Sequence, residues 1–231
     1  MEYIFETEHL RIRKFEMEDA QCLYENHLEE EVKKWIPNES YADMEEARNA
    51  IKFYMDCVDN GRLPYVLAVE LKGTGELIGD AGVNEVEGNS NEVEIGYGIC
   101  RKHSGKGYAT ELVKAMTEFM AGTFGISTLY GRVMHGNNAS VKVLERNGYE
   151  FVEEEFGAED DPYGNGMLIY KKYVKTRRSR EPRRTLSRAW TTAPGGGNPP
   201  PTGTMCAWRP GRTSSSMRLT ISSEKPVVEG T

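Results

Sequence analysis

The chain is most informative at residues 104–111, which read Ser104-Gly105-Lys106-Gly107-Tyr108-Ala109-Thr110-Glu111. This run follows an apolar, strand-like stretch from Val93 to Ile99, and it opens an amphipathic segment that is typical of a helix. Glycines let a ligand approach the backbone closely, and the free N–H groups of a helix's first turn attract anions. The run therefore predicts a backbone site for the diphosphate of a phosphorylated cofactor. The alternative interpretation is a helix start whose glycines serve turn geometry alone.

Spacing excludes two common phosphate-binding loops. A Walker-type loop needs a Gly-Lys pair followed by Ser or Thr, and here Gly105-Lys106 is followed by Gly107. A dinucleotide-binding loop needs the pattern Gly-x-Gly-x-x-Gly, whereas the run that starts at Gly105 ends on Thr110. Neither of these two loop classes fits the sequence.

The segments on either side of the loop agree with a cofactor site. Residues 91–95 alternate polar and apolar side chains, which is typical of a half-buried strand, and Gly96 and Gly98 then break the alternation. Glycines inside a strand often mark a bulge or a close backbone approach, so we expect a splayed strand there. Downstream, residues 137–149 begin with two Asn that are typical of helix caps and contain Gly148, a typical helix stop.

These segments resemble the GNAT N-acetyltransferase superfamily, whose acyl-CoA loop reads Gln or Arg, two residues, Gly, one residue, and Gly or Ala. The matching positions are Ser104, Gly105-Lys106, Gly107, Tyr108 and Ala109, and only Ser104 departs from the pattern. Residues 137–149 resemble the superfamily's second cofactor segment, which is Asn-x-x-Ser, a short helix, and Gly-Phe or Gly-Tyr. Residues 7–13 look like the first strand of the branch that acetylates the N-terminal alanine of ribosomal proteins. The resemblance covers about residues 3–174.

The resemblance implies an α/β fold with a mixed, largely antiparallel sheet that is splayed in the middle and flanked by helices on both faces. It also implies direct transfer of the acetyl group of acetyl-CoA, a co-substrate, to a primary amine in a ternary complex. A protein N-terminus is the leading acceptor, and small cationic amines stay open. A non-catalytic acyl-CoA sensor is an alternative function for the same fold.

Most of the expected acetyl-CoA contacts are backbone groups. The N–H groups of Tyr97, Gly98 and Ile99 are candidates for the thioester carbonyl oxygen, because preorganised peptide dipoles stabilise growing negative charge. The cofactor loop is expected to contribute Ser104, Gly105, Lys106, Gly107, Tyr108, Ala109 and Thr110. Lys106 is either a contact to the diphosphate or a solvated surface cation.

The second cofactor segment adds side-chain candidates by resemblance. Asn137 matches the family residue whose side chain touches the pantetheine arm, although a helix cap explains it equally well. Family members protonate the departing thiolate with a Ser or a Tyr near this segment, and Ser140 and Tyr149 match. Ser140 fits the Asn-x-x-Ser pattern and is preferred, whereas Tyr149 also fits a core residue.

A general base is expected on the splayed strand. Glu92 and Glu94 share one face by two-residue alternation, and a carboxylate beside the acceptor can take its proton directly or through a water. Glu94 is the first choice because it lies nearest the glycines, and the alternative is that both carboxylates face solvent. Glu111, in the first turn of the cofactor helix, is better explained by a favourable interaction with the helix dipole.

Hydrophobic periodicity and capping signals predict the order of the elements. Helices are expected at 19–29, extending toward Trp35, from Asp43 to Val58, at 105–121 and at 138–147. Strands are expected at 9–14, 65–71, 76–83, 91–99, 128–134, 149–155 and 166–173. The strands at 65–71 and 76–83 are expected to form a hairpin.

Charge divides the chain into two parts. From Thr176 onward there are nine Arg, one Lys and three Glu, a balance of +7, whereas residues 1–175 carry a balance of −14. Seven of the ten prolines also lie in this tail, so we expect an acetyltransferase domain at 1–175 and a disordered basic tail at 176–231. The acidic body favours a cationic acceptor. Nucleic-acid binding through the tail is an alternative, but its two Trp offer few stacking positions.

Cysteine spacing and hydropathy indicate which metal sites, membrane segments and cellular compartment to expect. The four cysteines lack the two-residue spacing of zinc sites or thioredoxin-like motifs, so no metal is expected. The chain has neither an apolar run of about twenty residues nor a signal-peptide start. We therefore expect a cytoplasmic monomer or homodimer with reduced thiols and no membrane partner.

Overall fold

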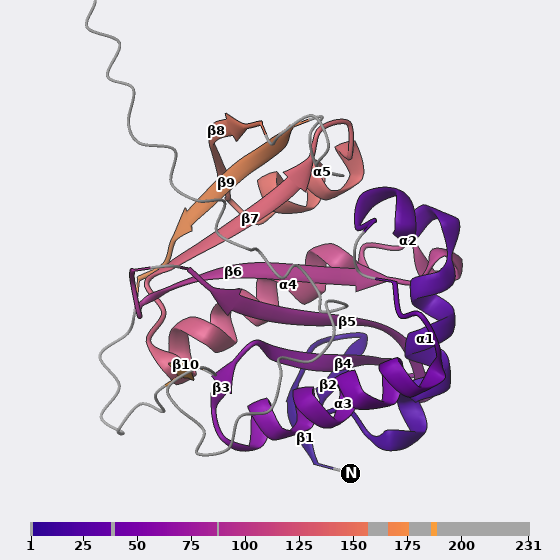
Figure 1. The fold of residues 1–231 in the computed structure, drawn as a ribbon. Coiled ribbons are helices and arrows are strands. Elements are labelled where there is room, and N and C mark those ends of the chain that lie inside the picture. The colour runs from indigo at the N-terminus through magenta and orange to yellow at the C-terminus, as the bar shows by residue number, and fades with distance from the viewer. Residues whose placement is uncertain (1, 38–39, 87, 157–165, 176–185, 189–231) are drawn as a thin grey trace, which may run out of the picture.

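The computed structural model describes residues 2–37, 40–86, 88–156, 166–175 and 186–188. They form an eight-stranded sheet in the order β1-β2-β4-β5-β6-β7-β9-β8, with helices on both faces (Figure 1). The strands are β1 (Tyr3–Glu6), β2 (Leu10–Arg13), β3 (Arg62–Leu63), β4 (Tyr65–Leu71), β5 (Glu76–Glu85), β6 (Glu92–Ile99), β7 (Thr128–Met134), β8 (Glu150–Glu155), β9 (Met167–Tyr173) and β10 (Ser187–Arg188). The helices are α1 (Ala20–Leu28), α2 (Glu30–Trp35), α3 (Met44–Asp59), α4 (Tyr108–Phe119) and α5 (Asn138–Arg146). The predicted mixed α/β fold is confirmed.

The sheet separates two apolar cores. Leu67 and Val69 of β4 pack in the cluster that includes α4, whereas Val66 and Ala68 pack in the cluster formed with α1 and α3. Successive side chains of a strand point to opposite faces, so each core takes every second residue. Because both faces are covered, β4 is apolar almost without interruption.

Helix α3 begins where its sequence predicts. The side chain of Asp43 accepts a hydrogen bond from the backbone N–H of Glu46 at 2.9 Å, which satisfies one of the helix's unpaired donors. Ala47, Ile51 and Tyr54 then recur at helical spacing and are fully buried. This apolar stripe holds α3 against β4.

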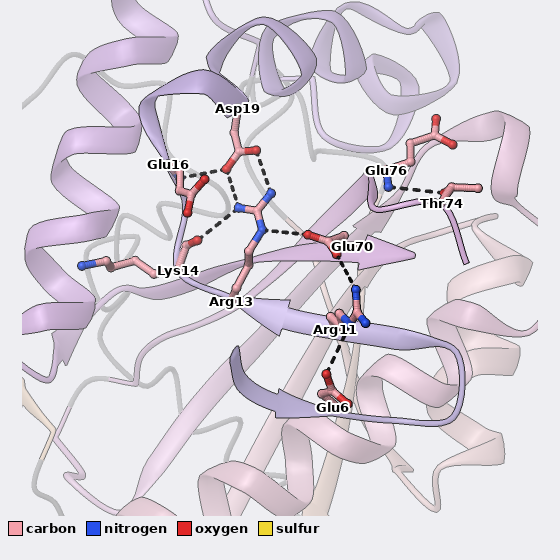
Figure 2. A network of polar contacts seen from close by, with 9 residues as sticks. All are labelled: Glu6, Arg11, Arg13, Lys14, Glu16, Asp19, Glu70, Thr74 and Glu76. Carbon is pink, nitrogen blue, oxygen red and sulfur yellow. Dashed lines mark hydrogen bonds and ion pairs between the residues drawn. The ribbon is translucent and has the colours of Figure 1, made fainter. Parts of the chain in front are cut away.

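Buried charges join β2, β4 and the turn before α1 (Figure 2). Arg13, which is 5% exposed, donates to both carboxylate oxygens of Asp19 at 2.7 and 2.9 Å and to Glu70 Oε2 at 3.2 Å. Glu70 also accepts a hydrogen bond from Arg11 at 3.4 Å. The hydrogen bond to Asp19 is the main reason why the pKa of Arg13 is raised. Because buried charges are costly unless paired, the network fixes these segments relative to one another.

The β6 and β7 strands run parallel and pair over a short distance. Their register joins Glu92 through Glu94 to Thr128 through Tyr130. Beyond these positions, residues 95–99 pair with β5 and residues 131–134 pair with β9. The two strands diverge toward the end of the sheet where α2 and α5 lie (Figure 1). The predicted splay is therefore present, and it begins next to Gly96.

Helix α5 lies close against β7 because Gly131 has no side chain. A Cβ built on Gly131 would lie only 2.7 Å from Leu144 Cδ1, which is closer than real Cβ contacts. Leu144 is buried at this contact. The glycine thus sets the distance between α5 and the diverging strand.

Two helices differ from their expected bounds. The expected helix at 19–29 ends at Leu28, because Glu29 leaves helical geometry with φ −59° and ψ 128°, and the chain restarts as α2. Helix α4 begins at Tyr108 rather than at 105, because Gly105 and Gly107 have φ of 75° and 90°. These left-handed angles favour glycine, so turn geometry is one real reason for the glycines.

Most of the basic tail, on which the alternative of nucleic-acid binding depends, lies outside the described residues. Leu186 packs against the core on the α4 side, and Ser187 and Arg188 pair in parallel with β3. In the described part of the chain, none of the helices has the length and apolarity that a membrane crossing requires.

The buried network predicts a large effect for Arg13→Met. The substitution keeps most of the side-chain volume but removes the cation between Asp19 and Glu70, so the free energy of unfolding should fall by about 3–5 kcal/mol. Lys14→Met removes an exposed ion pair with Asp59 and should cost about 1 kcal/mol or less. Urea unfolding of both variants checks this prediction. Equal losses in the two variants would contradict it.

Candidate active site

The loop before α4 is open to solvent. Ser104, Gly105, Lys106 and Gly107 are all exposed. A Cβ built on either glycine would meet no atom within 4 Å, apart from its chain neighbours. The space in front of the helix is therefore accessible to a ligand as large as a diphosphate.

The first turn of α4 offers backbone donors to that space. Its first intrahelical bond runs from Glu111 N–H to the Gly107 carbonyl at 3.1 Å, and Gly107 has no side chain to cap the turn. The N–H groups of Tyr108, Ala109 and Thr110 therefore have no partner within the helix. Together with the positive end of the helix dipole, they fit an anionic ligand.

Glu111 has a structural partner outside α4. Its carboxylate accepts a hydrogen bond from His9 N–H at 2.8 Å and lies 2.9 Å from His9 Nδ1. Burial raises the pKa of Glu111, but hydrogen bonds from Thr7 and His9 outweigh this effect and the pKa is lowered overall. The residue thus ties the cofactor helix to the start of β2, in addition to its favourable place near the helix dipole.

The strands β6 and β7 separate beyond Glu94, and the space between them is called the gap here. Two of the three expected N–H groups of β6 point into this gap. Cys100 N–H donates to the Ile78 carbonyl of β5 at 2.8 Å. Backbone donors of successive strand residues point to opposite edges, so Gly98 N–H also points toward β5. The N–H groups of Tyr97 and Ile99 then point to the edge from which β7 has departed.

Tyr97, Asn137 and Ser140 come together across this gap. The Tyr97 hydroxyl donates to the Ser140 carbonyl oxygen at 3.3 Å, which connects β6 to α5. Burial raises the pKa of Tyr97 to about 12, so this hydroxyl keeps its proton near neutral pH. The Asn137 side chain accepts from Ser140 N–H at 3.2 Å and is a helix cap, as one of its two interpretations expected. The sequence did not predict this hydrogen bond of the Tyr97 side chain, because the family resemblance assigns a function only to the Tyr97 backbone.

Tyr149 lies in the core. It is 2% exposed, and its hydroxyl is 2.8 Å from Thr117 Oγ1. Thr117 donates its own proton to the Val113 carbonyl at 2.7 Å, so the Tyr149 hydroxyl is the donor of this pair. Burial raises the pKa of Tyr149. The structure therefore fits the core interpretation of Tyr149 rather than a role in protonating a thiolate.

Glu92 and Glu94 lie where β6 is still paired with β7. Glu94 is 7% exposed and stands opposite Asn84 of β5 and beside Tyr130 of β7. Glu92 accepts a hydrogen bond from the Tyr130 hydroxyl at 3.0 Å. The alternative that both simply face solvent does not hold for Glu94, which is buried at the last paired position before the splay.

The segment from Glu29 to Trp35 touches both sides of the gap. Glu29 Oε2 accepts a hydrogen bond from Arg101 N–H at 3.2 Å, next to the cofactor loop. Trp35 Cη2 would lie 3.9 Å from a Cβ built on Gly136, in the loop between β7 and α5. The junction of α1 and α2 therefore borders the open end of the gap.

Sequence reasoning missed a buried pair near the same place. Asp80 of β5 and His27 of α1 are 6% and 4% exposed, and Asp80 Oδ2 lies 3.6 Å from His27 Nε2. The available signal was a charged residue inside an otherwise apolar strand, Leu77 to Val83. The histidine gave no such signal, because its helix is polar along most of its length.

Comparisons with known proteins agree with this geometry. The family described as acetyltransferase (GNAT) domain matches residues 9–150. The uncharacterized N-acetyltransferase p20 of Bacillus licheniformis is 31% identical over 148 residues, which is 64% of this chain and 82% of that protein. The structure of a GNAT-family acetyltransferase from Bacillus anthracis matches with a TM-score of 0.63 and 25% identity, over 73% of this chain and 96% of that chain. RimL, a ribosomal L7/L12 alpha-N-protein acetyltransferase in complex with coenzyme A, matches with a TM-score of 0.64 and 18% identity, over 76% and 100%.

The position of Tyr149 predicts a small and purely structural effect of Tyr149→Phe. The variant loses one buried hydrogen bond, so the free energy of unfolding should fall by about 1 kcal/mol. The affinity for coenzyme A should stay within about twofold, since the hydroxyl points to Thr117. Thermal unfolding and calorimetric titration check the two values. If the affinity for coenzyme A fell tenfold while the free energy of unfolding stayed unchanged, Tyr149 would be a ligand-binding residue and this prediction would be wrong.

Proposed function

Because the chain belongs to the GNAT acetyltransferase family, and is therefore an N-acetyltransferase that uses acetyl-CoA, we propose that its acceptor is a primary amine on a cationic partner. The leading acceptor is the amino terminus of a protein. The likeness of the fold to RimL, whose acceptor is a ribosomal protein, supports this choice. A small cationic amine is the second choice.

One observation carries the assignment of the site: the unpaired edge of β6 and the open end of α4 are adjacent in the chain. The strand ends at Ile99 and the loop begins at Ser104. A diphosphate on the backbone of residues 105–110 leaves the attached pantetheine arm free to run back along β6. Its thioester then reaches the edge that β7 has left.

Backbone donors are proposed to stabilise the reacting carbonyl. Negative charge grows on the thioester oxygen as the amine attacks, and fixed N–H dipoles stabilise it without reorganisation. Tyr97 and Ile99 supply the two N–H groups that point into the gap. Ser140 lies on the other side of the gap, and we assign to its hydroxyl the protonation of the departing thiolate. The bond from Tyr97 to the Ser140 carbonyl supports this placement.

Carboxylates are proposed to receive the acceptor. Glu94 lies on the sheet face that is opposite α4, with Glu92 two residues before it. Both are candidates to take the amine proton directly or through a water, and Glu94 is the nearer of the two to the splay. The net charge of −14 in residues 1–175 concentrates cationic amines near the protein.

A thiol-release assay with acetyl-CoA tests the choice of acceptor. The panel contains a peptide with a free amino terminus, the same peptide with a blocked terminus, spermidine, lysine and an aminoglycoside. The free peptide should give the highest kcat/KM, and the blocked peptide should give no turnover. Measurable coenzyme A binding without turnover of any amine would favour an acyl-CoA sensor instead.

Gly107→Glu tests the diphosphate site. The new carboxylate fills the space in front of α4 and repels the ligand, so the dissociation constant for coenzyme A should rise at least tenfold, or about 1.4 kcal/mol. Gly75→Glu is the matched control, because Gly75 also has a positive φ, of 71°, and open space at its Cβ. Both variants carry comparable backbone strain. Equal affinities in calorimetric titration would mean that the loop glycines serve turn geometry alone.

A further inference from the structure

Asp80 faces the exposed backbone of Gly98. The two residues stand directly opposite each other on β5 and β6, so they share one face of the sheet. A Cβ built on Gly98 would have one non-adjacent protein neighbour within 4 Å, which is Asp80 Oδ1 at 3.8 Å. Gly98 itself is exposed. A ligand group that lies over Gly98 therefore meets the Asp80 carboxylate before any other side chain.

The second oxygen of the same carboxylate faces His27. Asp80 Oδ2 lies 3.6 Å from His27 Nε2, and helix α1, which carries His27, packs against β5 (Figure 1). Both side chains are buried. A carboxylate in such a place is stabilised by a neighbouring group that can carry positive charge. One Asp80 oxygen therefore faces the Gly98 side, and the other faces the His27 imidazole.

This pair lies closer to the proposed thioester position than Glu94 does. Tyr97 and Ile99, whose N–H groups point into the gap, flank Gly98 on either side. Asp80 is one strand away from Gly98, with about 5.5 Å between the two Cα atoms in a hydrogen-bonded antiparallel pair. Glu94 is four residues away along β6, about 13 Å at 3.3 Å per residue.

We propose that Asp80 and His27 form the proton-accepting pair for the acceptor amine, on the sheet face that carries α1. The inference rests on the proposed function, since it names the base of that reaction. The nitrogen lone pair forms the N–C bond, and the C–S bond breaks with its electron pair on sulfur. The amine proton passes to Asp80 and from there to solvent, while His27, whose Nε2 lies 3.6 Å from Asp80 Oδ2, positions the carboxylate. The thiolate takes its proton from the Ser140 side of the gap.

Several other titratable groups lie around the pair. The Tyr41 ring packs against the His27 ring, and the Tyr41 hydroxyl lies 3.5 Å from that of Tyr54. Cys22 of α1, Glu29, Cys100 and Glu94 are further titratable groups on or beside the elements that carry the pair. Burial raises the pKa of the Cys22 and Cys100 thiols, so both stay neutral near neutral pH. Glu94 is the carboxylate that competes with Asp80 for the role, and the two must be tested side by side.

The test compares Asp80→Asn and His27→Gln with Glu94→Gln. The rates are measured with acetyl-CoA and the fastest amine of the acceptor panel, from about pH 6 to about pH 10. Asp80→Asn should lower kcat about 100-fold near neutral pH, with recovery as the pH approaches the pKa of the amine itself. His27→Gln should show a smaller loss of the same shape, about tenfold. The dissociation constant for coenzyme A should not change in either variant.

Three outcomes decide the matter. A pH profile of Asp80→Asn parallel to that of the wild type, or a pH-dependent loss confined to Glu94→Gln, overturns the pair and leaves acetyl transfer intact. No turnover of any amine by the wild type overturns both the pair and the proposed function. Asp59→Asn, which changes an exposed carboxylate at the end of α3, is the control that should leave the rates and their pH profile unchanged. Should Asp80→Asn fail to fold in a thermal melt, the profile of His27→Gln decides.

Discussion

The short parallel contact between β6 and β7 is the constraint on which the rest of the site depends. The other described neighbours in the eight-stranded sheet pair antiparallel, and these two strands share only three paired positions. The chain leaves β6, passes through the loop and α4, and returns to the beginning of β7. Because the strands part toward the loop, the N–H groups of Tyr97 and Ile99 point to the edge that β7 has left, at the end of β6 that leads to the loop before α4. The proposed site therefore depends on backbone geometry first and on side chains second.

Strand alternation assigns different tasks to the two faces of β6. Val93 and Ile95 point into the apolar core on the α4 side, and Tyr97 and Ile99 pack partly against it. The residues between them are carboxylates and glycines, which face α1 and α3. One strand thus anchors the sheet with one face and keeps a polar, glycine-lined surface on the other. This division explains why the alternation stops where the glycines begin.

The sequence was sufficient for much of the fold, because periodicity and caps are local signals. The strand at 128–134 was predicted to the residue, and Asp43 caps α3 as expected. The end of the helix at 19–29 was predicted to within one residue, but its restart as the separate helix α2 was not, since a single backbone rotation at Glu29 leaves no mark in hydrophobic spacing. The alternation of polar and apolar residues predicted which face of the sheet carries Glu94. It did not predict that Glu94 is buried, because burial depends on neighbouring strands. The contact of His27 with Asp80 joins residues far apart in the chain, and no local pattern reports it.

The junction of α1 and α2 has a consequence for local stability. Glu29 accepts a hydrogen bond from the Arg101 backbone beside the loop before α4, and the Trp35 ring lies near Gly136 in the loop before α5. One short segment thus lies against both walls of the gap. Local unfolding of this segment would therefore uncover both walls at the same time.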